Sequence, residues 1–378
     1  MAQQYNIKDV KSHESAYDRK VNELEEELST TKYNKKTQGH IGLVKAKLAK
    51  LKEEYQRKAA AKSGGQGFSV RRTGDATAII VGFPSVGKST LLNAITNANS
   101  PVGAYAFTTL TCIPGLLEYN HAQIQILDVP GIVEGAATGR GRGKEVLACA
   151  QSADFVIILL DVFNQQHLEV VKKEIYETGL RINQKFPQVR ISKKLRGGID
   201  LGVTVKLTKI SEDTIKNILK EFRLENSSVV IREDITDDQL IDAIDGNKKY
   251  VPGITVLNKI DMVDKEELER IKEIVEPDIC ISAENKINTE KLKELIFKRL
   301  EFIRIYTKEA GKKPDTNIPL IMRKGNTLKD FCLKLHKDFI SKFRFARIWG
   351  KSARFGGMPV RKLGHILEDN DIVEIHLS

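Results

Sequence analysis

The sequence predicts a multidomain α/β protein with a parallel sheet at its centre. Its 378 residues are enough for two or three domains of about 150 residues each. Between residues 76 and 281, apolar runs typical of buried strands alternate with segments typical of helices. The flanking segments have other patterns, one helical and one made of short strands around a helix. We therefore expect a parallel sheet with helices on both faces, flanked by two further domains.

The first expected domain, residues 1–62, is a helical hairpin. Apolar residues recur every three or four positions in two stretches, from Val21 to Leu28 and from Ile41 to Tyr55, so each helix has one apolar stripe. The polar stretch 30–39 between them predicts a turn. The Gly-rich, basic stretch 61–75 predicts a connector to the next domain.

The second expected domain, residues 63–302, contains the alternation. Its strands are predicted by the runs ATAIIVGF, QIQILDVPG, FVIILLDV and GITVLNKID, and later by DICISAE. The stretch from Asp161 to Asn258 is too long for a single crossover. Within it, IDLGVTVKL and SSVVIRED are typical of strands, whereas SEDTIKNILKEFRL and DDQLIDAI are typical of helices. We therefore expect an inserted α/β subdomain at about residues 186–246.

The third expected domain, residues 303–378, is small. Short runs such as IRIYT, PLIMRKG and DIVEIHL predict strands, and LKDFCLKLHKDFISKF predicts one helix. One helix over a small mixed sheet is the ubiquitin-like, β-grasp pattern.

The net charge of +11 is uneven along the chain. Residues 1–70 hold 14 basic and 9 acidic residues and residues 301–378 hold 16 and 9, which leaves 31 and 32 for residues 71–300. Two basic ends around a neutral centre predict contact with a polyanion, and two solvated basic surfaces are the alternative.

Several classes of protein do not fit the sequence. No stretch approaches the roughly 18 apolar residues that a membrane span requires, so we expect no membrane association and a cytoplasmic location. The four cysteines stand far apart, and none of the seven histidines lies at ligand spacing from a carboxylate or cysteine. A zinc site or a disulfide framework is therefore not expected.

The most specific motif is GFPSVGKST, residues 82–90. It matches G-x-x-x-x-G-K-[ST] between a predicted strand and a predicted helix. Gly82 and Gly87 let the backbone curl so that successive N–H groups face phosphates. Lys88 would then reach the β- and γ-phosphates, and the Ser89 hydroxyl would ligate Mg²⁺. This motif predicts binding of a nucleoside triphosphate.

Three further motifs follow predicted strands and point to guanine. In DVPG, Asp128 can hold Mg²⁺ through water and the Gly131 N–H can touch the γ-phosphate. In NKID, Asp261 can accept hydrogen bonds from the N1 and N2 donors of guanine, while Lys259 covers the base plane. In SAE, the N–H of Ala283 would meet the guanine O6. Because adenine does not offer these donors, the motifs select GTP over ATP.

Together with YAFTTLTCIPG at 105–115 and DVPGIVEGAATGRGRGKEVL at 128–147, these motifs resemble those of Obg-type GTPases, and specifically the developmentally regulated GTP-binding proteins of archaea and eukaryotes. The resemblance implies a helical hairpin, a Ras-like core with an insert resembling a ribosomal-protein fold, and a C-terminal TGS domain of β-grasp type. It also implies association with translating ribosomes or ribosomal RNA and a regulatory partner protein. It assigns Thr109 as the second protein ligand of Mg²⁺, with Thr108 as the rival.

The expected site residues form two groups. Those expected to bind the nucleotide are Gly82, Phe83, Pro84, Ser85, Val86, Gly87, Lys88, Ser89, Thr90, Asp128, Gly131, Asn258, Lys259, Asp261, Ser282, Ala283 and Glu284. Those expected to act in hydrolysis are Lys88, Thr109, Asp128 and Gly131, with Ser89 and Thr109 as the metal ligands.

One position predicts slow hydrolysis. Where Ras carries a Gln that orients the attacking water, this chain has Ile132, whose side chain cannot form hydrogen bonds. Related GTPases with an apolar residue there use a K⁺ ion held partly by a P-loop Asn. The corresponding residue here is Ser85, so K⁺ stimulation is a hypothesis.

Two segments leave alternatives open. The glycines of EGAATGRGRGK predict either a switch loop or a flexible surface loop. The stretch KFRFARIWGKSARF, residues 342–355, has the composition of a surface for unpaired RNA, but it also fits core aromatics with a basic outer face.

The function expected is a slow, Mg²⁺-dependent GTPase that binds GTP and GDP and regulates translation through the ribosome. The alternative is an RNA- or protein-binding adaptor, or a signalling switch, in which GTP mainly controls conformation.

Overall fold

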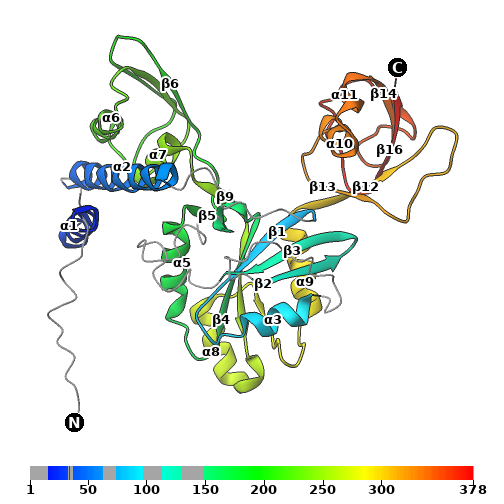
Figure 1. Ribbon diagram of the computed structural model, residues 1–378, viewed down its shortest axis with the longest axis horizontal. Coiled ribbons are helices and arrows are strands. Elements are labelled where there is room, and N and C mark those ends of the chain that lie inside the picture. Colours follow the sequence, from blue (N-terminus) through cyan, green and yellow to red (C-terminus); the bar gives the residue numbers. More distant parts are fainter. Residues whose placement is uncertain are drawn as a thin grey trace. The chain divides into compact units, whose positions relative to one another are not determined.

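The computed structural model describes residues 16–32, 34, 37–62, 74–96, 113–129 and 149–377. These residues divide into two compact units. The hairpin unit lies within residues 1–67 and 185–248, and the sheet unit lies within residues 68–184 and 249–378. Figure 1 shows both, with elements labelled where there is room.

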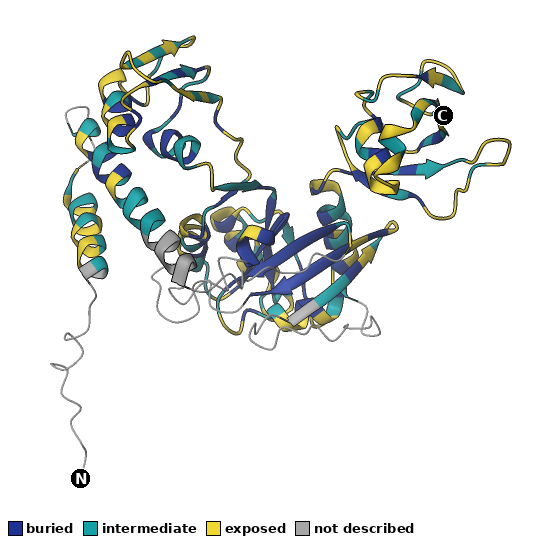
Figure 2. Cartoon of the chain, turned by 45° about the horizontal axis from the view of Figure 1, so that its top comes forward, coloured by how far each residue is buried: buried dark blue, intermediate teal, exposed yellow. Residues whose placement is uncertain are grey.

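The sheet unit is built on a six-stranded sheet in the order β11-β10-β4-β1-β3-β2. The five strands from β11 to β3 are parallel to their neighbours, and β2 pairs antiparallel with β3. The strands are β1 (Ala76–Val81), β2 (Ile113–Tyr119), β3 (Ala122–Asp128), β4 (Phe155–Asp161), β10 (Gly253–Asn258) and β11 (Ile279–Cys280). Continuous apolar runs form β1 and β4 because both faces of these strands are buried (Figure 2). The predicted α/β core is confirmed.

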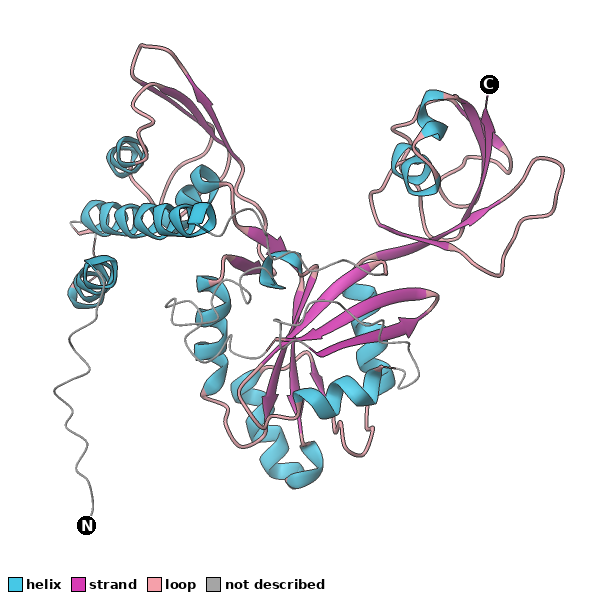
Figure 3. Cartoon of the chain, in the orientation of Figure 1, coloured by secondary structure: helices cyan, strands magenta, loops and turns pink. Residues whose placement is uncertain are grey.

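Helices cover both faces of this sheet (Figure 3). One buried cluster joins the sheet to α3 and α9, and a second joins its other face to α5 and α8. These helices are α3 (Lys88–Ile95), α5 (His167–Glu177), α8 (Lys265–Val275) and α9 (Thr289–Arg299). A short 3-10 helix, η3 (Ile260–Met262), follows β10, and the small pair β5 (Leu180–Ile182) and β9 (Lys249–Val251) brackets the insert.

Strand β2 was not predicted from the sequence. Pro114 and Gly115 stand near its start, and both are poor strand formers. An edge strand tolerates Pro because one side of its backbone has no neighbour to bond. Gly115 is required by packing, since a Cβ there would lie 2.6 Å from the Thr96 side chain.

The hairpin unit joins the N-terminal helices to the insert. Helix α1 (Ala16–Thr30) packs on α2 (Gln38–Lys62), and α2 also packs on α6 (Glu212–Glu221) and α7 (Asp237–Asp245) of the insert. The insert adds a three-stranded sheet in the order β6-β8-β7, formed by β6 (Val189–Lys193), β8 (Ser227–Ile231) and β7 (Ile199–Val203). The strands and helices predicted inside the insert are present, and β6 is an addition to them.

Small residues allow α2 to approach the insert closely. Ala46 is fully buried in the cluster formed by the insert. A Cβ at Gly42 would lie 2.8 Å from the Thr214 side chain, closer than carbon atoms normally approach. Lys45 on the same helix pairs with Asp237 at 3.1 Å and with Asp238 at 2.8 Å. The hairpin helix therefore has its own complementary surface on the insert.

The C-terminal part of the sheet unit has a five-stranded mixed sheet in the order β13-β12-β16-β14-β15. Its elements are β12 (Phe302–Thr307), β13 (Leu320–Arg323), α10 (Leu328–Leu335), α11 (Asp338–Ser341), β14 (Phe343–Trp349), β15 (Met358–Val360) and β16 (Asp371–Leu377). The prediction of a single helix is wrong in one respect. The segment forms two helices, α10 and α11, because the extended backbone of His336 ends α10. The sheet with one main helix across it has the expected β-grasp form.

Within the described residues no helix is long and apolar enough to cross a membrane. The same part of the chain holds no cluster of three or more His, Cys, Asp or Glu residues able to bind a metal ion. The four-part division drawn from the sequence remains a prediction.

Candidate functional site at the carboxyl edge of the sheet

The loop 82–87 joins β1 to α3 at the carboxyl edge of the sheet. Its backbone depends on glycine at both ends: a Cβ at Gly82 would lie 2.4 Å from the Leu159 carbonyl oxygen, and Gly87 has a left-handed φ of 95°. Gly87 is also the N-cap of α3, where the described residues make no side-chain cap hydrogen bond. The first turn of α3 is therefore open to an anion.

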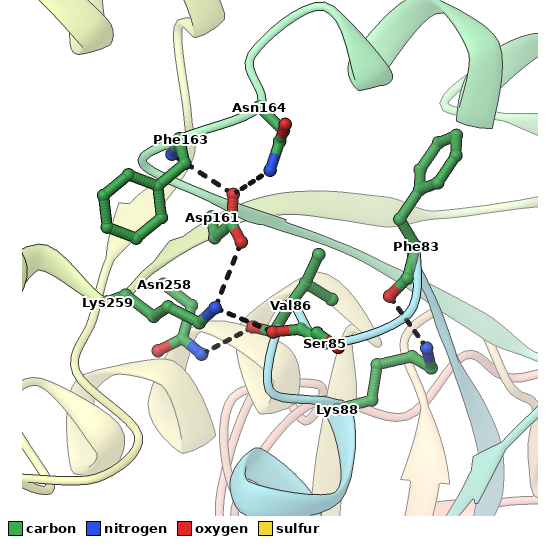
Figure 4. Close-up of polar contacts among 9 residues, drawn as sticks. All are labelled: Phe83, Ser85, Val86, Lys88, Asp161, Phe163, Asn164, Asn258 and Lys259. Atoms are coloured by element: carbon green, nitrogen blue, oxygen red, sulfur yellow. Dashed lines mark hydrogen bonds and ion pairs between the residues drawn. The ribbon is translucent and has the colours of Figure 1, made fainter.

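Lys88, the first residue of α3, folds back over this loop. Its Nζ donates to the carbonyl oxygen of Phe83 at 3.0 Å (Figure 4) and to that of Gly82 at the same distance. The Phe83 ring in turn stacks on His167 at the start of α5, with ring centroids 3.8 Å apart. The ammonium group thus lies over the curled backbone where phosphates would be held.

Ser89 and Asp128 form the part of the site that suits a metal ion. The Ser89 hydroxyl donates to Asp128 Oδ2 at 3.4 Å, and Asp128 is only 7% exposed at the end of β3. Burial raises the pKa of the Asp128 carboxyl, and the nearby Lys88 charge and the Ser89 hydrogen bond oppose that rise. Its Oδ1 is buried and accepts no hydrogen bond from the described residues. A hydroxyl beside a carboxylate with a spare oxygen is a donor set that fits Mg²⁺.

Asn258, at the end of β10, joins three loops. Its Nδ2 donates to the Val86 carbonyl at 2.9 Å, and its Oδ1 accepts from the Ala283 N–H at 3.0 Å. Because the Asn258 side chain is nearly fully buried, these bonds fix loop 82–87, which we call the phosphate loop, against the loop that follows β11.

Lys259 adds a second tie to the phosphate loop. Its backbone is left-handed, and its Nζ donates to the Ser85 carbonyl at 2.7 Å. The same Nζ pairs with Asp161 Oδ2 at 3.1 Å, as Figure 4 shows. The exposed Phe163 ring lies with its centroid 5.8 Å from this nitrogen. The lysine side chain is therefore held in place from both sides.

Asp161 is a site residue that the sequence analysis missed. It is 4% exposed and stands opposite Asn258 in the register of β4 and β10. Its Oδ1 accepts from the Phe163 N–H and from Asn164 Nδ2, both at 3.2 Å, so the carboxylate is fixed. The sequence signal for Asp161 was its position at the carboxyl end of the buried strand FVIILLDV. That signal is not specific, because Asp commonly follows strands.

The remaining predicted residues lie around the same edge. Asp261 lies exposed in η3, and Ser282 is buried and accepts from the Asn285 N–H at 3.1 Å. Pro84, Thr90 and Glu284 are exposed. The structure thus brings Gly82–Thr90, Asp128, Asn258–Asp261 and Ser282–Glu284 to one edge. Thr108, Thr109, Gly131, Ile132 and the glycines of EGAATGRGRGK lie outside the described residues.

Comparison with known proteins decides the family. Over 94% of its length the chain is 42% identical to developmentally-regulated GTP-binding protein 1 of Xenopus laevis, 98% of which is covered. The chain belongs to the developmentally regulated GTP-binding protein family. Developmentally-regulated GTP-binding protein 2 of Homo sapiens is 41% identical over the same shares, and an uncharacterized GTP-binding protein of Methanocaldococcus jannaschii is 54% identical over 94% of this chain and 91% of its own.

Family models cover most of this GTPase. Residues 77–194 match the family described as 50S ribosome-binding GTPase, residues 196–302 match the C-terminal region of that domain, and residues 303–377 match the TGS domain. The YchF GTPase structure of Schizosaccharomyces pombe is similar with a TM-score of 0.44 and 14% identity, over 81% of this chain and 99% of that one. The predicted GTPase class and the TGS domain are confirmed.

Proposed function

We propose that this GTPase binds GTP and GDP in the pocket formed by loop 82–90 and the NKID and SAE loops, and that it hydrolyses GTP slowly. The observation that supports this most directly is the side chain of Asn258, which ties the Val86 carbonyl to the Ala283 N–H. The phosphate loop and the two loops expected to read the base are thereby held in one rigid arrangement before any nucleotide binds.

The phosphates bind to the N–H groups of the loop and of the first turn of α3. Lys88 Nζ, an ammonium group with three donors, reaches the β- and γ-phosphates from its place over the carbonyls of Gly82 and Phe83, which it contacts. Ser89 and Thr109 would hold Mg²⁺, with Asp128 holding it through water, and the ion would supply positive charge beside the phosphates. Gly131 supplies an N–H to the γ-phosphate.

Guanine is selected by Asp261, whose carboxylate accepts from N1 and N2 of the base. Lys259 presents its stem to the base plane while its Nζ remains bonded to Ser85 and Asp161. The Ala283 N–H already donates to Asn258 Oδ1, so the guanine O6 has to share that donor with the asparagine.

Hydrolysis is slow because Ile132 cannot orient water. We expect turnover of about 10⁻⁴ to 10⁻² per second without an activator, as for unassisted GTPases of this class. We propose K⁺, bound beside Ser85, as the second cation that assists the hydrolysis of GTP.

The test of enzymatic function is multiple-turnover phosphate release. Lys88→Ala is expected to abolish it, whereas the control Lys265→Ala, which replaces the lysine at the first position of α8, is expected to leave it unchanged. An adaptor that only binds GTP would show no turnover in the unmodified protein, and that result would refute the proposal.

We also propose that the nucleotide cycle regulates translation through ribosome or ribosomal RNA association in the cytoplasm, with a regulatory partner protein. The matched family is described as ribosome-binding, and both ends of the chain are basic. The test is sedimentation with ribosomes in GDP, GTP and a non-hydrolysable analogue. Migration at the top of the gradient in all three states would overturn the ribosome role and leave the GTPase role intact.

A further inference from the structure

Phe83, the second residue of the phosphate loop, connects this loop to α5. Its ring stacks on the imidazole of His167, the first residue of α5, with ring centroids 3.8 Å apart and an interplanar angle of 21°. Its carbonyl oxygen points away from the ring and accepts a hydrogen bond from Lys88 Nζ at 3.0 Å (Figure 4). One residue therefore joins the start of α5 to the lysine expected to reach the phosphates.

The turn that precedes α5 fixes the position of His167. Asp161 Oδ1 accepts hydrogen bonds from the Phe163 N–H and from Asn164 Nδ2, both at 3.2 Å. The Asn164 carbonyl oxygen in turn accepts from the His167 N–H at 3.2 Å. Because Asp161 is 4% exposed at the end of β4, this turn is anchored in the buried sheet. His167 is thus held by β4 and not by the loop on which it stacks.

The segment after β4 supports the phosphate loop at two places. Asp161 acts on the middle of the loop through Lys259, whose Nζ pairs with Asp161 at 3.1 Å and donates to the Ser85 carbonyl at 2.7 Å. His167 acts on the start of the loop through the Phe83 ring. The two supports use different chemistry, an ion pair in one place and a pair of rings in the other.

The contact between the two rings depends on packing and not on a hydrogen bond. His167 Nδ1 is buried and forms no hydrogen bond with the described residues. Stacked rings stabilise a structure beyond the area that they bury. A second flat ring should therefore replace the imidazole, whereas a methyl group should not. This distinction separates a role of the ring from a role of its nitrogen atoms.

We propose that His167 is a positioning residue of the GTPase. Its ring fixes Phe83, and thereby the carbonyl oxygen that places the Lys88 ammonium group over the phosphate loop. The inference rests on the proposed GTPase function, in which Lys88 reaches the β- and γ-phosphates. A displacement of about 1 Å in a group that acts on the reacting atoms can slow a reaction about a hundredfold. Without the stack, the start of the loop loses its support and Lys88 loses its fixed place.

The test is phosphate release measured as a function of GTP concentration, which separates kcat from KM. His167→Ala is expected to lower kcat at least about tenfold and to change KM less than about threefold, because a positioned cation matters most where charge develops in the transition state. His167→Phe keeps a flat ring and is expected to retain kcat within about twofold. Recovery by a ring without nitrogen would assign the role to the stack.

Two further variants separate positioning from general stability. Ile175→Ala, the matched control, removes a side chain that is 1% exposed and lies about two turns further along α5. It is expected to lower the melting temperature and to leave kcat unchanged. Phe83→Leu keeps the backbone carbonyl but removes the partner ring. In a double-mutant cycle, adding His167→Ala to Phe83→Leu should hardly lower kcat any further.

Three results would overturn the inference: an unchanged kcat in His167→Ala, equal losses of kcat in His167→Ala and His167→Phe, or additive losses in the cycle with Phe83→Leu. The first of these leaves the GTPase role intact, because the unmodified protein still turns over GTP. Absence of turnover in the unmodified protein would instead overturn the GTPase role, and the positioning role with it.

Discussion

The pair of Asp161 and Lys259 offers the sharpest test of how the pocket is organised. We expect Asp161→Asn to weaken the binding of both GTP and GDP, because Lys259 loses the charged partner that keeps its aliphatic stem beside the base. The Nζ to Oδ2 distance is 3.1 Å, and the two side chains are 27% and 5% exposed, so water replaces the bond poorly. A hydrogen bond between charged groups contributes about 1.5 to 3 kcal/mol. The lower value alone corresponds to about a tenfold loss of affinity.

The assay is dissociation of a fluorescent guanosine diphosphate followed by stopped flow. Faster release is expected in Asp161→Asn. Asp264→Ala, which removes the N-cap of α8 near the same loop, is the control for general destabilisation and is expected to lower the melting temperature with little change in release. In a double-mutant cycle, adding Asp161→Asn to Lys259→Ala should hardly change the rate of guanosine diphosphate release any further. If the two effects are additive, Asp161 does not act through Lys259 and the reasoning is refuted.

Three further predictions concern other parts of the molecule. Asp261→Asn is expected to weaken GTP binding at least about tenfold, because it replaces one of the two carboxylate acceptors for the base by an NH₂ donor, and to favour xanthosine triphosphate. Competition binding measures both effects, and unchanged GTP affinity would contradict the base-reading role. Gly42→Ala is expected to destabilise the hairpin unit by about 1 to 3 kcal/mol in denaturant unfolding, because its Cβ would lie 2.8 Å from the Thr214 side chain. The control is Gly39→Ala on the same helix, whose Cβ would lie 3.5 Å from Thr214 and which should be neutral or stabilising. Replacing K⁺ with Na⁺ is expected to slow phosphate release, and equal rates in the two salts would exclude a K⁺ role.

The sequence predicted the parts of the site that depend on local spacing. GFPSVGKST and NKID can be recognised from spacing alone, since glycines stand at fixed positions in the first and the second comes just after a buried strand. Asp161 could not be found in this way. Its importance depends on the register of β4 and β10, which places it opposite Asn258, and register is a property of the whole sheet.

The same distinction applies to the fold. The apolar stripe of α2 was visible from periodicity, but a stripe does not identify its partner. The contact of α2 with α6 depends on Gly42 and Ala46, whose small size matters only against Thr214 and its neighbours. Likewise, the continuous apolar pattern of LKDFCLKLHKDFISKF does not show the extended backbone at His336 that divides it into α10 and α11.

The hairpin unit has a consequence for synthesis of the chain. Its first half ends at residue 67, but the surface on which α2 packs is completed only by α7, which ends at Asp245. At about 5 to 20 residues per second, the ribosome needs roughly 10 to 40 seconds to make the intervening residues. During that time the side of α2 that packs on the insert, including Ala46, has no insert to cover it. Helix α2 is thus made well before the surface of the insert on which it packs, which makes this side of the nascent helix a place where a chaperone would be needed.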